Sequence, residues 1–135
     1  MATLIQYDHS PKVLVNGTIN WLTDDVKLAL VDSDYTPSLA HTAWASVSAD
    51  VVGSPVSLAS KSADNDKLTA ANLTLSSLTA TFRYIVLYAE GVDKGPDDIT
   101  DPLIGYYDMG TDVIVDDADY PINFSGSGII ALANE

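Results

Sequence analysis

The chain has 135 residues, and its 19 acidic against six basic residues give a formal net charge of −13. A phosphate-binding surface needs clustered Lys or Arg, so this balance argues against nucleic acid and anionic membranes as partners. The length is that of one domain, residues 1–135, and the absence of cysteine excludes disulfides and thiolate zinc sites.

The N-terminal residues, MATLIQYDHSPK, have neither a basic start nor an apolar run of signal-peptide length. Nowhere do eighteen apolar residues follow one another. We therefore expect no signal peptide and no membrane span. We expect residues 1–12 to form an arm outside the core.

A dense apolar segment, VKLALVD at residues 26–32, predicts a strand between the Asp24-Asp25 turn and the turn-rich DSDYTPS. Weaker strand patterns precede it at residues 12–17 and 18–22 and follow it at residues 51–60 and 67–77. Between them, residues 38–49 (SLAHTAWASVSA) favour a single helical turn.

The clearest strand is LTATFRYIVLYAEG at residues 78–91, where aromatic and β-branched residues dominate. Strict alternation places one set of side chains on one face: Ala80, Phe82, Tyr84, Val86 and Tyr88. The other face then carries Thr81, Arg83, Ile85, Leu87 and Ala89. Both faces are apolar at the centre, which predicts a central strand covered on both sides.

Two more strands are predicted at residues 103–110 (LIGYYDMG) and 122–133 (INFSGSGIIALA), separated by the acidic loop DVIVDDADYP. A loop at residues 92–102 precedes them. Turn signals recur about every 8–15 residues along the chain, which is typical of an all-β sandwich or barrel. We predict an antiparallel β-sandwich of the jelly-roll type in a single domain.

Calcium is the metal that the acidic loops would suit, because it prefers oxygen ligands. If the two loops met at one end of a sandwich, the ligands would be Asp97, Asp98, Asp101, Asp116 and Asp117. The alternative is solvated loop charge on an acidic protein, and we favour it, so we predict no metal and no cofactor.

No nucleophile motif is present. The segment FSGSGII places Ser125 where a nucleophile elbow requires its first glycine, and we predict no catalytic residue. Aromatic side chains are the better candidates for contacts with a partner, and we single out Trp44, Tyr35, Tyr106 and Tyr107. Because Tyr106 and Tyr107 are consecutive in a strand, one of them points outward unless another layer covers it. The alternative is that these aromatics fill the core.

Five segments in order, NGTINWLTDDVKLALVDSDYTP, HTAWASVSADVVGSPVSLASKS, ATFRYIVLYAEG, DPLIGYYDMG and GIIALA, resemble a family of small structural proteins of tailed double-stranded-DNA bacteriophages and prophages. The resemblance runs from about Asn16 to Ala133 and departs from the family pattern in residues 51–75 and 92–102. Each motif is a strand or turn piece, so their joint order carries the resemblance.

The resemblance implies a non-enzymatic virion structural protein, most simply a capsid decoration (cement) protein. Such a protein is assembled in the host cytoplasm and lies on the capsid exterior. Its partner is the major capsid protein of the same phage, whose shell it binds and stabilises as a homotrimer. A neck or tail component is the alternative within this class. A carbohydrate-binding or adhesin module is a different class, and an enzyme is a third.

Overall fold

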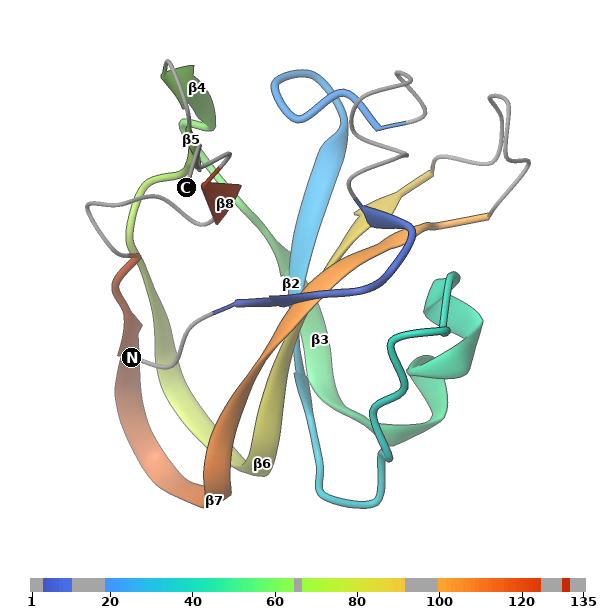
Figure 1. The fold of residues 1–135 in the computed structure, drawn as a ribbon. Coiled ribbons are helices and arrows are strands. Elements are labelled where there is room, and N and C mark those ends of the chain that lie inside the picture. Colours follow the sequence, from blue (N-terminus) through green and yellow to red (C-terminus); the bar gives the residue numbers. More distant parts are fainter. Residues whose placement is uncertain (1–3, 11–18, 65–66, 92–99, 125–129, 132–135) are drawn as a thin grey trace.

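Antiparallel strands dominate the computed structural model, which describes residues 4–10, 19–64, 67–91, 100–124 and 130–131. The larger sheet has the order β1-β7-β6-β2-β3, and a small sheet has the order β4-β5-β8 (Figure 1). The larger sheet contains β1 (Ile5–Gln6), β2 (Asp25–Val31), β3 (Val51–Ser57), β6 (Leu73–Glu90) and β7 (Leu103–Ile122). The small sheet contains β4 (Ser62–Asp64), β5 (Lys67–Thr69) and β8 (Ile130–Ala131).

Two short 3-10 turns are present, η1 (Trp44–Ser46) and η2 (Ser48–Asp50). They lie within or next to the segment where the sequence favours a helical turn. No helix in this part of the chain is long and apolar enough to cross a membrane. The predicted all-β antiparallel class and the single small domain are confirmed, and the described strands do not close into a continuous barrel.

Strand β2 is the predicted apolar strand, and it lies between β6 and β3. Its pairing with β6 is regular, from Asp25 opposite Glu90 to Val31 opposite Tyr84. At the Asp25 end, the Lys27 ammonium lies 2.8 Å from a Glu90 carboxylate oxygen. The acidic turns therefore lie at the two ends of this strand, outside the core.

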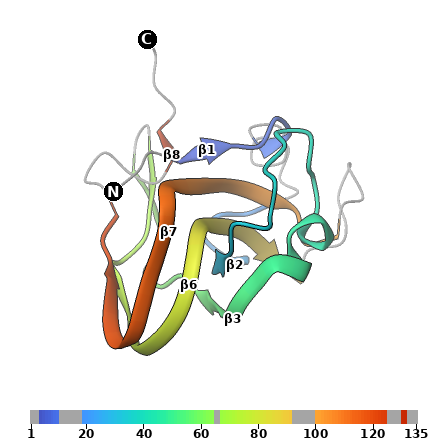
Figure 2. The same cartoon turned by 90° about the horizontal axis from the view of Figure 1, so that it is seen from below.

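Strands β6 and β7 form one long bent hairpin, which Figure 2 shows curving together. The predicted acidic loop at residues 112–121 is wrong, because these residues continue β7 to Ile122. Its alternation explains why: Val113 and Val115 pack against the core while Ile114 between them is 76% exposed. The alternating valines hold this acidic segment in a strand even though Asp is disfavoured there.

An irregularity in the hairpin changes which residues face which side of the sheet. Phe82 lies opposite Val113 but Tyr84 lies opposite Asp108, so residues 109–112 of β7 bulge out. Gly110 within the bulge has φ +84°, a conformation that glycine adopts without strain. The Arg83 guanidinium spans the irregularity and donates to Asp108 Oδ1 at 3.0 Å.

The alternation predicted for residues 78–91 is wrong at this irregularity, because Phe82 and Tyr84, predicted on one face, pack into different core clusters. Two cores lie on the two faces of the sheet. One contains Phe82 together with Ile85 and Leu87, and the other contains Tyr84 with Val86 and Tyr88. The prediction that this strand is covered on both faces is confirmed.

The N-terminal residues 4–10 lie on the sheet rather than apart from it. Ile5 and Gln6 pair with β7, and Tyr7 is only 1% exposed. Residues 19–22, within the second weak strand pattern, form a turn in which Trp21 is buried. The weak pattern at residues 12–17 lies outside the described residues. The pattern at 51–60 becomes β3, and the pattern at 67–77 supplies β5 and the start of β6.

Candidate functional site

The proposed interface tyrosines Tyr35 and Tyr106 lie inside the core that covers one face of the sheet. Tyr35 is 3% exposed, and its hydroxyl is 2.9 Å from the Tyr7 hydroxyl and 2.9 Å from His41 Nδ1. Tyr106 packs against the rings of Tyr7 and Tyr84. This hydrogen-bonded cluster attaches the N-terminal segment and the residue 32–50 loop to the sheet.

Tyr107 lies in the core on the opposite face and is 5% exposed. The two neighbouring tyrosines thus point to opposite faces, and both faces are covered. Burial raises the pKa of Tyr107 to about 12. Burial, followed by the hydrogen bond to Tyr35, also raises the pKa of Tyr7. These hydroxyls are structural groups that stay protonated at neutral pH.

Trp44, the fourth interface candidate, is half-buried and stacks on Tyr88 with ring centroids 3.9 Å apart. Its backbone N–H donates to the Asp101 carbonyl at 2.9 Å. None of the chain's two tryptophans, seven tyrosines and two phenylalanines is exposed. The aromatic side chains that sequence reasoning assigned to contacts are therefore used within the fold.

Of the five residues considered as calcium ligands, the three that the structure describes do not gather at one place. Asp101 lies at the end of the hairpin where Leu103 pairs with Tyr88, and its Oδ1 accepts the Gly91 N–H at 2.8 Å. Asp116 and Asp117 lie far along β7, next to the pair of Val115 with Ala80. Asp97 and Asp98 lie outside the described residues.

A different set of carboxylates does come together. Asp32, Asp34 and Asp50 have ligand oxygens within 4.8 Å of one another. Asp32 follows β2 and Asp50 precedes β3, and the Asp32 N–H donates to the Asp50 carbonyl at 3.0 Å. Asp32 Oδ1 also accepts the Asp34 N–H at 2.9 Å. These bonds account for the proximity as turn geometry where two strands meet.

The second half of β7 forms an exposed acidic surface, which we call the acidic ribbon (residues 112–119). Asp116, Asp117 and Asp119 are exposed, and none of them has an ion-pair partner among the described residues. The ribbon is fixed to β6, because the Asp117 N–H donates to Thr79 Oγ1 at 3.0 Å and Asp119 Oδ1 accepts the Ser77 N–H at 3.0 Å. Charge and exposed apolar surface at Ile114 thus share one rigid strand.

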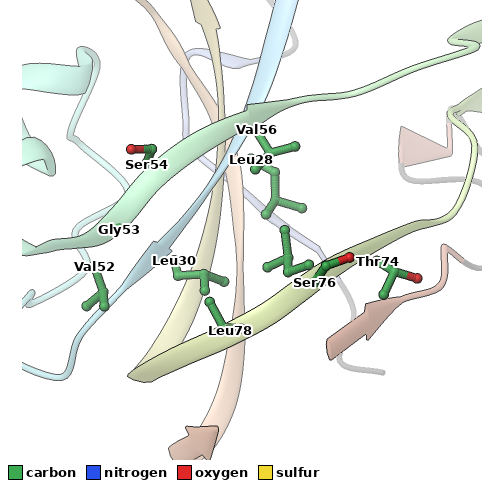
Figure 3. A pocket seen from close by; sticks show the side chains of 10 residues that line it. Leu28, Leu30, Val52, Gly53, Ser54, Val56, Thr74, Ser76 and Leu78 are labelled. Carbon is green, nitrogen blue, oxygen red and sulfur yellow. The ribbon is translucent and has the colours of Figure 1, made fainter. Parts of the chain in front are cut away.

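An apolar groove lies where β3 and the first part of β6 diverge over β2, with a volume of about 330 Å³ (Figure 3). Its lining contains no ionisable side chain. The lining residues are Leu28 and Leu30 from β2, Val52, Gly53, Ser54 and Val56 from β3, and Thr74, Leu75, Ser76 and Leu78 from β6. Sequence reasoning missed this groove, because it exists only where the bent hairpin returns over β2.

Comparisons with protein-family models, with curated proteins and with solved structures found no match. Two structural features therefore stand as candidate binding surfaces, the acidic ribbon and the apolar groove. Neither has the arrangement of a catalytic centre. No carboxylate whose burial the structure describes is buried, and the one buried polar residue in that part of the chain is Ser10.

Proposed function

We propose that this protein is a non-enzymatic virion structural protein, a capsid decoration protein that binds the shell of a phage's major capsid protein from outside. The order of strand and turn motifs suggests the class. The acidic ribbon is the structural observation that carries the proposal. It offers carboxylates and an exposed isoleucine on a strand held by regular pairing, which suits contact with a broad protein surface.

The proposal includes a jelly-roll-like sandwich as the architecture. Support comes from the bent hairpin, whose two halves contribute to one core. Leu75, Leu78 and Val115 from the outer half pack against the cluster that contains Leu28 and Leu30 of β2. The outer half of the hairpin therefore acts as a second layer over β2.

The structure supports the alternative functions, a neck or tail component and a carbohydrate-binding or adhesin module, to different degrees. A neck or tail component uses the same kind of surface, so it stays the nearest rival. A carbohydrate-binding or adhesin module needs an exposed aromatic platform, and all aromatic side chains of this chain are buried or half-buried. We therefore rank the adhesin below both virion locations.

Trimerisation is part of the proposal, because copies joined to one another engage a shell with avidity of about 10²–10⁴ over a single copy. Sedimentation velocity at micromolar concentration should give a single species of three times the 14.3 kDa chain mass. A monomer under these conditions would remove the trimer from the proposal.

Cryo-electron microscopy of the intact particle tests the function. Density for this chain on the capsid exterior, in contact with shell subunits, is the expected result. Density restricted to the neck or tail would move the protein to that location, and a particle without the chain would refute the structural role.

A matched pair of variants tests the acidic ribbon in the same particles. Asp116→Lys with Asp117→Lys reverses two charges on the ribbon, and we expect fewer copies per particle. Asp8→Lys with Asp25→Lys makes the same change in total charge outside the ribbon and should leave the copy number unchanged. Equal loss in both would assign the effect to net charge alone.

A further inference from the structure

The apolar groove is bounded by two strand edges that have no partner among the described residues. Strand β3 is the last strand of its sheet and pairs only with β2. Strand β6 pairs with β2 only over residues 84–90, so its first half, residues 73–82, pairs with β7 alone. An unpaired strand edge presents backbone N–H and C=O groups that can pair with another chain.

The two edges meet at one end of the groove and separate toward the other. The Ala71 N–H donates to the Ala59 carbonyl at 2.9 Å, which joins the chain just before β6 to the chain just after β3. Beyond this bond the strands diverge, and Leu28 and Leu30 form the floor between them (Figure 3). The groove therefore lies between two free strand edges, above the apolar side chains of β2.

The β6 edge is the better of the two for accepting a strand. On β3, Gly53 has φ +76° and the pairing with β2 shifts between Val52 and Val56. Pro55 in this stretch has no N–H to donate. Bulges and proline are devices that protect an edge from pairing. The first half of β6 is also irregular, since Ser77 has φ +48° and its pairing with β7 shifts between Leu75 and Leu78. Residues 73–82 contain no proline, however, so each of them has a backbone N–H.

We propose that the groove binds an extended segment of a partner protein as an added strand along β6, with aliphatic side chains at alternate positions and lysine or arginine at its ends. Thr74 to Leu78 are four steps of roughly 3.3 Å, or at most about 13 Å, which fits a segment of about five residues. Backbone pairing supplies affinity in this binding mode, and the pockets for alternate side chains supply specificity.

Charge decides the chemistry of the partner. Asp117 and Asp119 of the acidic ribbon lie across β6 from its free edge and are bonded to Thr79 and Ser77, the chain neighbours of the groove residues Ser76 and Leu78. They lack cationic partners in the described part of the chain. A segment with basic ends would find complementary charge there. A second copy has only six basic against 19 acidic residues, so it is a poorer match for this groove than a segment with basic ends.

The inference rests on the proposed function only for the source of the segment, which would then be an arm or loop of a shell subunit. Its test needs the purified chain alone. A failure there leaves the particle experiment untouched, and a particle without the chain leaves the groove experiment untouched.

The test is a titration of the ¹⁵N-labelled protein, followed by amide chemical shifts, with the peptide acetyl-Lys-Val-Thr-Val-Thr-Val-Lys-amide. We expect saturable shifts concentrated in residues 52–56 and 74–78. The same peptide with glutamate in place of both lysines should bind at least tenfold more weakly. Of two analogues N-methylated on the valines or on the threonines, at least one should lose binding, because it cannot pair along one edge.

Val56→Ser and Leu39→Ser form the matched pair of protein variants. Both positions are exposed, Val56 at 36% and Leu39 at 42%, so both variants are expected to fold, as the amide spectrum will show. Val56 lines the groove, and Leu39 belongs neither to the groove nor to the acidic ribbon. Val56→Ser should weaken binding about tenfold through lost apolar contact, and Leu39→Ser should leave it unchanged.

Several outcomes would overturn the proposal. These are the absence of shifts at millimolar peptide, equal binding of the glutamate peptide, and full binding of both N-methylated analogues. Concentration-dependent shifts of the groove amides without peptide would assign the groove to a second copy and would equally overturn it.

Discussion

Gly105 shows how a single position fixes the N-terminal strand to the sheet. A Cβ built on Gly105 would lie 2.8 Å from the Ile5 carbonyl oxygen and 2.9 Å from Leu4 Cγ. Contacts this short force β1 away from β7. Gly105→Ala should therefore destabilise the protein by about 1–3 kcal/mol, measured by urea unfolding.

Hydrogen exchange locates the damage. In Gly105→Ala, the Tyr7 amide that donates to Ile104 should lose protection. Gly110→Ala serves as the comparison, because Gly110 has φ +84° and open space around its Cβ position. That variant should lose stability through backbone strain while Tyr7 keeps its protection. Unchanged protection in both variants would contradict the role of Gly105.

The burial of Tyr107 predicts how the stability of the protein changes at alkaline pH. Burial raises its pKa from the ordinary tyrosine value of 10.0 to about 12 in the folded protein. The folded state therefore favours the protonated hydroxyl. This contribution to stability is complete below pH 10 and is lost as the pH rises from 10 to 12.

Tyr107→Phe should consequently show a shallower loss of stability than the wild type between pH 10 and 12. The difference in slope should approach about 1.4 kcal/mol per pH unit, measured by urea unfolding at a series of pH values. The two proteins should run parallel between pH 6 and 9. Parallel curves at all pH values would mean that the hydroxyl is solvated in the folded state.

At the scale of the element, the β6–β7 hairpin has a buried side and an exposed side. One substitution on each side should differ clearly in its effect on stability. Phe82 is fully buried, and Phe82→Ala should cost about 3–5 kcal/mol. Ile114 is 76% exposed, so Ile114→Ala should lower the free energy of unfolding by less than about 1 kcal/mol. Urea midpoints measure both, and a near-neutral Phe82→Ala would show that the hairpin does not cover the core.

The same hairpin shows what sequence patterns can and cannot predict. Strand β2 and the centre of β6 were predictable, because dense runs of β-branched and aromatic residues lie between turn signals. The bulge opposite Arg83 was not, because period-two alternation continues through the sequence while the register slips by three residues in the partner strand. The acidic stretch of β7 was mistaken for a loop because its aspartates outweighed the alternating Val113 and Val115.

At the scale of the whole molecule, the candidate site depends on contacts that no local pattern contains. The groove combines β2, β3 and β6, whose meeting requires the hairpin to bend. The tyrosines that seemed suited to contacts are buried, because the residue 32–50 loop and the N-terminal segment cover the face from which Tyr106 would otherwise project. Only the acidic character of the surface could be predicted directly from the sequence, because it depends on composition alone.

That excess of acid should cost stability through self-repulsion. Asp116 and Asp117 are adjacent, exposed and without ion-pair partners in the described part of the chain. Asp117 has φ +47°, which asparagine tolerates well. Asp116→Asn with Asp117→Asn should therefore raise Tm by about 1–3 °C in 10 mM NaCl.

Salt provides the control for this prediction. The Debye length falls from about 30 Å at 0.01 M to about 3 Å at 1 M, so added NaCl should raise the wild-type Tm and shrink the difference between the two proteins. A difference that persists at 1 M NaCl would assign the effect to local backbone preference at Asp117 instead of charge. A difference that vanishes at 1 M NaCl would assign the Tm gain to repulsion between these carboxylates.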